Sequence, residues 1–297
     1  MSNLRLLKDK LAARAMLAMT ILASLLVLAM VAGLYWKAKP ILDAKSIVEL
    51  LFSSTWKPLK GEFGFWAFIA GSLAVTGMAV ALSVPFSLLT ALYLSEYAGS
   101  RIRELAKPLI DVLAGIPSVV YGIWGVLVVV PFVKDHVAPT LGVFSTGYCV
   151  LSAGIVLAIM VLPIVIHITL EVLAAVPRGV REASLSLGAT KWQTTKHVVL
   201  RKAAPGVIAA VVLGLSRAFG ETMAVLMVAG NVAKTPTSLL SPAYPLPALI
   251  ANNYGEMLSI PMYDAALMLA SLILLMVVLV FNVLAKLILV RVQRSVA

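Results

Sequence analysis

Two charged residues, Arg217 and Glu221, interrupt an apolar stretch at residues 204–230 that is long enough to cross a membrane. Their spacing of four residues places both side chains in one row of a helix. A central Arg costs about 2.5–3.5 kcal/mol on membrane-insertion scales, so ionisable groups at this depth predict a functional site. The Arg217 guanidinium offers a fork of donors suited to the oxygens of an anion. The alternative is that Glu221 pairs with Arg217 and only makes insertion tolerable.

A stripe of small residues on the same helix is expected to position this row. Its four members are spaced by four residues: Gly206, Ala210, Gly214 and Ala218. Such a stripe lets a second helix approach closely in lipid, so we expect Arg217 and Glu221 at the edge of a tight helix contact. Two roles are open for Glu221, which repels an anion. It closes a gate with Arg217, which we favour, or it accepts a hydrogen bond from a protonated anion.

A second group of polar residues lies in the third apolar stretch. Pro117 removes one backbone hydrogen bond there, and Ser118 and Tyr121 add hydroxyl groups nearby. Ser118 and Tyr121 are therefore secondary candidates for a substrate path. A kink that serves only helix packing is the alternative.

The composition places these groups in a polytopic membrane protein. Of 297 residues, 61% are hydrophobic and only 12% are charged, whereas soluble domains carry about 25% charged residues. The apolar runs predict an all-α fold with six spanning helices: Met16–Trp36, Trp66–Leu94, Pro108–Phe132, Gly147–Leu173, Ala204–Gly230 and Asp264–Val290. The first run is longer than the apolar core of a signal peptide, so we expect a retained helix.

The distribution of Lys and Arg predicts that both termini are cytoplasmic. The inner segments of that topology hold 15 of these residues and the outer segments hold 7. We interpret the net charge of +11 as this topology signal and not as a nucleic-acid surface. The chain divides at residues 1–65, 66–290 and 291–297, with the inner loop 174–203 in the second part and no separate soluble domain.

The sequence shows no catalytic or metal-binding constellation. It lacks the GxxxxGK[ST], HExxH and G-x-S-x-G patterns, and its three histidines lie in different segments. His167 and Glu171 are four residues apart on one helix face, which predicts a local hydrogen bond and not a ligand pair. We therefore expect a protein that is not an enzyme.

The inner loop 174–203 predicts two short helices. Val180–Leu187 is expected to form the first, Gly188 to end it with a left-handed residue, and Thr190 to cap the second. This arrangement exposes Trp192 and several aliphatic side chains. The residues alone leave open whether the loop binds a partner or rests on lipid headgroups.

The sequence EASLSLGA at residues 182–189 closely resembles the EAA motif of type I ABC importer permeases. In that family the loop docks on a separate ATPase subunit, which implies an ATPase-coupling role for four residues: Glu182, Ala183, Gly188 and Trp192. The family pattern continues to Ile-x-Leu-Pro, whereas Val198, Leu200 and Arg201 stand at those places here. This departure leaves the end of the second short helix open.

Two further motifs show which family of importer permeases the sequence resembles most. GIPSVVYGIWG at residues 115–125 and SRAFGETMAVLMVAGN at residues 216–231 flank the EAA-like loop in the order found in the PstC family of phosphate permeases. The resemblance implies the MetI-like fold of these permeases. It also implies a non-enzymatic subunit of an ATP-driven inorganic phosphate importer in the inner membrane, working by alternating access.

The same resemblance implies partner proteins, and two alternative functions stay open. The partners are a PstA-like permease chain, two copies of a PstB-like ATPase that binds the ATP and Mg²⁺, and an extracytoplasmic PstS-like phosphate-binding protein. The outer loop 231–263 is either a docking surface for that binding protein or an ordinary loop. The rivals are a permease of the same build for molybdate, sulfate or a phosphonate, and an ion-coupled secondary transporter.

Overall fold

The computed structural model describes residues 2–255 and 260–296, which are mostly α-helical. Six of the described helices are long and apolar enough to cross a membrane: Lys8–Ala44, Trp66–Tyr97, Ser118–Thr140, Val150–Ala174, Lys191–Phe219 and Tyr263–Leu284. The predicted all-α fold with six spanning helices is confirmed, and the second and fourth predicted spans begin and end within three residues of α3 and α8.

The α-helices are α1 (Ser2–Ala44), α2 (Ile47–Phe52), α3 (Trp66–Leu92), α4 (Ser100–Gly115), α5 (Ser118–Trp124), α6 (Val130–Phe132), α7 (Ala138–Thr140), α8 (Val150–Ala174), α9 (Arg178–Ser186), α10 (Lys191–Gln193), α11 (Leu200–Phe219), α12 (Met223–Val228), α13 (Leu246–Asn253) and α14 (Tyr263–Val296). Four π-helical segments extend or join these helices: Tyr93–Tyr97, Gly125–Val129, Val133–Val137 and Thr194–Val199. A 3-10 turn at Pro58–Lys60 joins the antiparallel strands β1 (Trp56–Lys57) and β2 (Glu62–Phe63).

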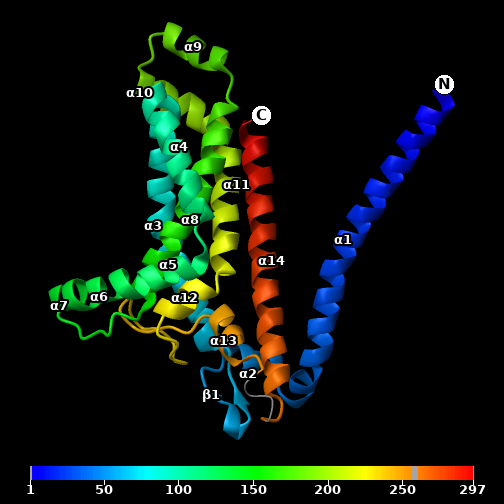
Figure 1. Ribbon diagram of the computed structural model, residues 1–297, viewed down its shortest axis with the longest axis vertical. Helices are drawn as coiled ribbons and strands as arrows, with labels where there is room; N and C mark the ends of the chain where they lie inside the picture. Colours follow the sequence, from blue (N-terminus) through cyan, green and yellow to red (C-terminus); the bar gives the residue numbers. More distant parts are fainter. Residues whose placement is uncertain (1, 256–259, 297) are drawn as a thin grey trace.

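The long helices form a bundle with two different ends (Figure 1). Helices α3, α8, α11 and α14 run along the bundle, and the loop that carries α9 and α10 lies at one end, which we call the α9 end. The start of α1 and the end of α14 also lie toward the α9 end. The β1–β2 hairpin, α2 and α13 lie at the opposite, hairpin end.

Helix α8 is the centre of the bundle because it packs against both α3 and α11. The contact with α11 is close, since a Cβ placed on Gly214 would lie 2.6 Å from Val165 Cγ2 and 3.0 Å from Val161 Cγ1. A Cβ on Gly206 would overlap the side chain of Val172 in the same way. The other two members of the small-residue stripe are buried: Ala210 and Ala218.

The predicted third span, Pro108–Phe132, is wrong as a single helix. Helix α4 stops inside it and α5 begins after a break at Ile116–Pro117. Ile116 is extended, with φ −66° and ψ 128°, because a proline disfavours a helical residue before it. The Tyr121 hydroxyl donates to the Leu113 carbonyl at 2.8 Å and so satisfies an acceptor on the far side of the break.

The predicted fifth span, Ala204–Gly230, is also wrong as a single helix. Helix α11 ends partway along the bundle (Figure 1), and α12 follows after a turn at Gly220–Thr222. Glycine is a poor helix former, and the Glu221 Oε1 atom accepts the backbone N–H of Ala224 at 3.3 Å, which stabilises a new helix start. Arg217 and Glu221 therefore lie on different segments and not in one helical row.

The loop at the α9 end differs from the prediction in its second helix. Helix α9 matches the expected first helix, Gly188 has the predicted left-handed backbone (φ +82°), and Thr190 caps the next helix with a capping box to Gln193. That next helix does not stop, because α10 continues through Thr194–Val199 into α11. A continuous helix therefore joins the loop to the middle of the bundle.

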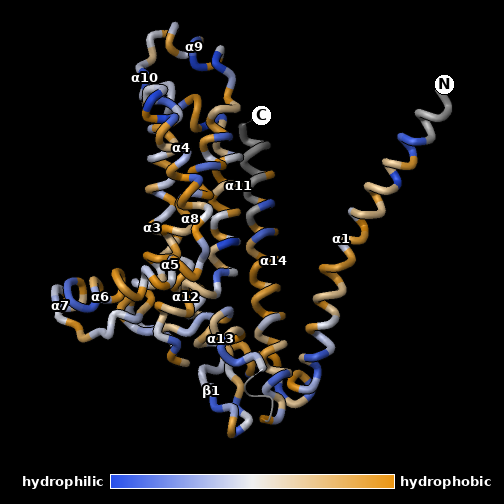
Figure 2. Tube along the Cα trace, viewed as in Figure 1, coloured by the Kyte–Doolittle hydropathy of each residue, from blue (hydrophilic) through white to orange (hydrophobic). Residues whose placement is uncertain are grey.

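Helix α1 is longer than the predicted span Met16–Trp36 and leaves the bundle. It meets α14 near the hairpin end, where Ala38 and Ile41 are buried and Lys37 Nζ lies 4.0 Å from Asp264 Oδ2. Residues 8–30 are exposed and mostly hydrophobic (Figure 2). This part of α1 makes its apolar surface available to lipid or to another chain.

Gly214→Ala tests the close contact between α8 and α11. The added Cβ must displace the stiff side chains of Val165 and Val161, so we expect a loss of about 1–3 kcal/mol in stability and a melting temperature several degrees lower. The matched control is Gly77→Ala in α3, because a Cβ there meets no atom within 4 Å. Equal melting temperatures for the two variants in detergent would contradict the contact.

Candidate functional site

The two interrupted helices meet inside the bundle, where α12 packs against α5. Gly122 of α5 makes the contact close, since a Cβ there would lie 3.3 Å from Ala224 Cα and closer still to the Met227 sulfur. Interrupted backbone at membrane depth is tolerated only where it is buried in protein or lines a water-filled cavity. The candidate site is therefore the region around the ends of α4 and α11 and the starts of α5 and α12.

Arg217 lies in the last turn of α11, and its side chain is exposed. The residues on either side face protein: Ser216 Oγ donates to Asn282 Oδ1 of α14 at 3.1 Å, and Ala218 is buried. An exposed guanidinium at this depth is costly against lipid. Arg217 therefore faces water or a partner protein when the chain lies in a membrane.

Glu221 is partly buried, in contrast to the exposed Arg217. It lines a very small internal space together with Ser72 and Thr76 of α3. Across residues 2–255 and 260–296, no ion pair joins Glu221 to Arg217. The expected pairing is therefore absent in this conformation. Ser72 and Thr76 were not among the predicted site residues. Serine and threonine are common in helices, and only the fold shows that these two lie beside Glu221.

The two secondary candidates lie at the start of α5. Ser118 is its first residue and is partly buried, whereas the Tyr121 side chain is buried and its hydroxyl is engaged with the Leu113 carbonyl. Tyr121 thus links α4 and α5 by a hydrogen bond across the break between them. A role for either residue in a substrate path stays a prediction.

The loop that carries α9 and α10, residues 178–193, presents an exposed surface. All four of the residues predicted to couple to an ATPase are exposed: Glu182, Ala183, Gly188 and Trp192. Leu187 is 88% exposed and Trp192 is 55% exposed. Large apolar side chains held out at the tip of a loop are typical of a surface that binds a partner.

An ion pair holds this loop to the bundle. The Arg181 guanidinium donates to both carboxylate oxygens of Glu96, with Nη2 at 2.9 Å from Oε1 and Nε at 3.2 Å from Oε2. The same guanidinium donates to the carbonyls of Leu173 and Val176 at the end of α8. Arg181 therefore ties α9 to the ends of both α3 and α8.

Further contacts surround the Arg181–Glu96 pair. Lys191 Nζ lies 4.8 Å from the centre of the Tyr97 ring, a cation–π contact that brings α10 to the segment after α3. The hydroxyls of Ser184 and Thr194 lie 2.9 Å apart and join α9 to the helix after it. Sequence analysis missed this arrangement because Glu96 and Arg181 are 85 residues apart in the chain.

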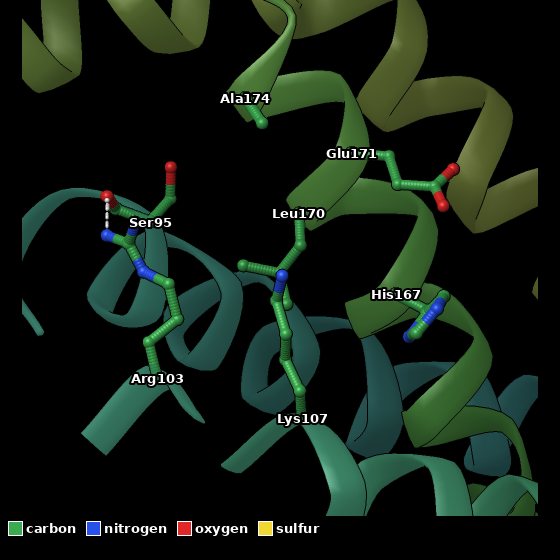
Figure 3. A pocket seen from close by; sticks show the side chains of 7 residues that line it. All are labelled: Ser95, Arg103, Lys107, His167, Leu170, Glu171 and Ala174. Carbon is green, nitrogen blue, oxygen red and sulfur yellow. Dashed lines mark hydrogen bonds between the residues drawn. The ribbon is translucent and has the colours of Figure 1, made fainter. Parts of the chain in front are cut away.

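A pocket near the same end lies between α4 and α8 (Figure 3). Arg103, Lys107, His167 and Glu171 are among the residues that line it. The predicted bond between His167 and Glu171 is not found; His167 Nδ1 lies 3.5 Å from Asp111 Oδ1 instead. Among the residues that the structure describes, no group of three or more His, Cys, Asp or Glu side chains could hold a metal ion.

Residues 83–297 match the model of the family described as binding-protein-dependent transport system inner membrane component. The chain belongs to this family. The match covers both interrupted helices and the α9–α10 loop, whereas Ser72 and Thr76 beside Glu221 lie before the matched residues. The chain is a multi-pass membrane protein of this kind.

Named relatives and solved structures are similar to this inner membrane component. It is 36% identical over 277 residues to the phosphate transport system permease protein PstC of Xylella fastidiosa, covering 89% of this chain and 85% of the relative. It is 34% identical over 264 residues to a probable PstC of Methanocaldococcus jannaschii, covering 84% and 83%. A chain of a bacterial alginate ABC transporter aligns with a TM-score of 0.64 at 18% identity, covering 94% of this chain and 93% of that one. A chain of the MetNI methionine ABC transporter aligns with a TM-score of 0.56 at 20% identity, covering 79% of this chain and 94% of that one. These structural likenesses show the MetI-like importer-permease fold.

Arg181→Gln tests how the α9–α10 loop is held. Hydrogen bonds to charged groups contribute about 1.5–3 kcal/mol, so their loss should raise the rate of chymotrypsin cleavage near Leu187 and Trp192 roughly tenfold. Glu96→Gln should act in the same direction. The matched control is Lys196→Gln, an exposed residue beyond the loop. Cleavage of Arg181→Gln at the wild-type rate would contradict this account.

Proposed function

We propose that this chain is a PstC-like permease subunit of an ATP-driven importer of inorganic phosphate. The observation that carries the proposal is the exposed guanidinium of Arg217 at the end of a helix that stops partway through the bundle. The similarity to PstC relatives over most of the chain supports phosphate as the anion. ATP and Mg²⁺ belong to a separate ATPase, and this chain is not catalytic.

The proposed path for phosphate passes the interrupted helices. Arg217 offers two parallel donors to phosphate oxygens, and Ser118 lies at the neighbouring helix break. Glu221, in the turn between α11 and α12, is the gate residue. It repels the anion and keeps binding weak enough for release, and it pairs with Arg217 only if the turn at residues 220–222 rearranges.

The proposed coupling route starts at the α9–α10 loop, which docks on a PstB-like ATPase dimer. Glu182, Ala183, Gly188 and Trp192 form the docking surface. The helix from Lys191 to Phe219 joins that surface directly to the Arg217 region. At about 1.5 Å per residue this helix is roughly 40 Å long, so a displacement of the loop is passed along one helix to the site.

The proposed assembly includes a PstA-like permease chain and an extracytoplasmic PstS-like phosphate-binding protein. The α9 end, and with it both chain termini, lies in the cytoplasm, which agrees with the excess of Lys and Arg in the inner segments. The PstA-like chain covers the face of α11 that bears Arg217. The outer loop 231–263 is on the side of the binding protein, and residues 256–259 of it lie outside the described ranges.

Arg217→Ala should reduce ATP-dependent phosphate uptake about tenfold or more, because the charge-assisted bonds to the anion are lost. Uptake is measured in vesicles that contain the chain with its partners, with and without internal ATP and with excess external sulfate. The matched control is Arg201→Ala near the start of α11, which should keep wild-type uptake. Uptake that does not depend on ATP would overturn the importer assignment.

The same uptake assay distinguishes the role of Glu221 from that of Arg217. Glu221→Gln should lower uptake or allow sulfate to compete, because both proposed roles of Glu221 need a carboxylate. Wild-type uptake and wild-type rejection of sulfate in Glu221→Gln would remove Glu221 from the mechanism. Wild-type uptake in an assembled Arg217→Ala complex would remove Arg217 from the phosphate path.

A further inference from the structure

The pocket between α4 and α8 at the α9 end is separate from the Arg217 site. Its volume is about 200 Å³, and it is lined by Ser95, Arg103, Lys107, His167, Leu170, Glu171 and Ala174. A cavity needs about 10–15 Å³ to hold one water molecule, so this pocket accommodates several water-sized groups. A tetrahedral oxyanion fits in this space.

Arg103 is held in place at one wall of the pocket. Its Nε donates to the Leu94 carbonyl at 2.9 Å and its Nη2 donates to the Ser95 carbonyl at 2.7 Å. Figure 3 shows the guanidinium turned to Ser95 along the side of the pocket. Within the described ranges, Nη1 has no protein acceptor, so the guanidinium has a fixed orientation and a donor to spare.

Lys107 lies one helical turn after Arg103 and extends its side chain toward Leu170 of α8 (Figure 3). Two like charges four residues apart on a helix repel each other. Neither Arg103 nor Lys107 forms an ion pair with any residue in 2–255 or 260–296. Two unneutralised cations at the wall of one pocket favour an anion between them.

The acidic and titratable groups nearby limit how tightly an anion binds. Glu171 comes from α8, and its carboxylate points away from Arg103 (Figure 3). His167 also comes from α8, and its Nδ1 lies 3.5 Å from Asp111 Oδ1. The negative charge of Glu171 weakens binding of an anion, which suits a site that must release its ligand.

We propose that this pocket binds a phosphate group, with Lys107 and Arg103 as its cationic partners. The inference rests on the proposed function, because that function places the α9 end in the cytoplasm, where imported phosphate is released. Inorganic phosphate and the phosphate of an anionic lipid headgroup share the chemistry that these residues recognise. The site sits beside the Arg181–Glu96 pair, since Ser95 lines the pocket and its hydroxyl donates to Glu96 Oε1 at 3.0 Å.

The test measures equilibrium binding of radiolabelled inorganic phosphate to the assembled transporter in nanodiscs, without ATP and without the binding protein. Lys107→Gln should raise the dissociation constant about tenfold in phosphatidylcholine nanodiscs, because one charge-assisted bond is lost. Glu171→Gln should lower it several-fold, a gain that a misfolded variant does not show. Arg101→Gln is the matched control, a cation on α4 that does not line the pocket, and it should leave binding unchanged.

A second arm identifies the source of the phosphate group. In nanodiscs that contain phosphatidylglycerol, native mass spectrometry counts the lipids retained by each variant. Retention of phosphatidylglycerol that Lys107→Gln loses and Arg101→Gln keeps, with no effect on inorganic phosphate, assigns the pocket to a lipid headgroup. If Lys107→Gln and Arg101→Gln behave alike in both arms, the pocket binds no phosphate group and the inference is overturned.

The two proposals fail separately. Absence of ATP-dependent phosphate uptake by the wild-type complex removes the proposed function, whereas the effect of Lys107→Gln on binding needs no transport. Conversely, intact uptake together with binding that ignores Lys107 and Glu171 removes only the pocket.

Discussion

Lipid offers no hydrogen-bond partner to a peptide group, so a spanning helix can be interrupted only where protein or water satisfies the backbone. This chain interrupts two helices, at Ile116–Pro117 and at Gly220–Thr222, and it supplies partners at both places. The Tyr121 hydroxyl bonds the Leu113 carbonyl at the first break, and the Glu221 carboxylate bonds the Ala224 N–H at the second. Because α5 and α12 pack on each other, the breaks lie in one region, and the rest of the bundle holds that region in place.

One continuous helix connects the exposed Arg217 with the α9–α10 loop. The close packing of α11 on α8 through Gly206 and Gly214 fixes the helix that carries Arg217. That helix runs without a stop from the loop to the site, and the Arg181–Glu96 pair ties the loop to α3 and α8. Hydrogen-bonded helices therefore connect the loop with the end of α11, which is the link that the proposed coupling route requires.

Local signals were enough to predict much of this fold. The apolar runs predicted the bounds of α3 and α8 to within three residues. Gly188 and Thr190 carry the turn chemistry that ends one helix and caps the next. The end of α11 was missed because its turn depends on where the Glu221 carboxylate finds a backbone donor. Pro117 indicated a kink, whereas the helix breaks completely there and the Tyr121 hydroxyl bonds the Leu113 carbonyl across the break. The Arg181–Glu96 pair joins residues that only the folded chain brings together, so no local pattern reveals it.

The proposed phosphate path requires above all that Arg217 faces water. The chain has one cysteine, Cys149, which is buried and can be replaced by alanine to give a background for labelling. Arg217→Cys in the assembled transporter should then react with a membrane-impermeant thiol reagent, inorganic phosphate should slow the reaction, and ATP should change the side from which it occurs. Leu22→Cys on the exposed apolar part of α1 should stay unreactive, because lipid or another chain covers that surface in the membrane. An Arg217→Cys variant that resists the reagent from both sides, with and without ATP, would contradict the account.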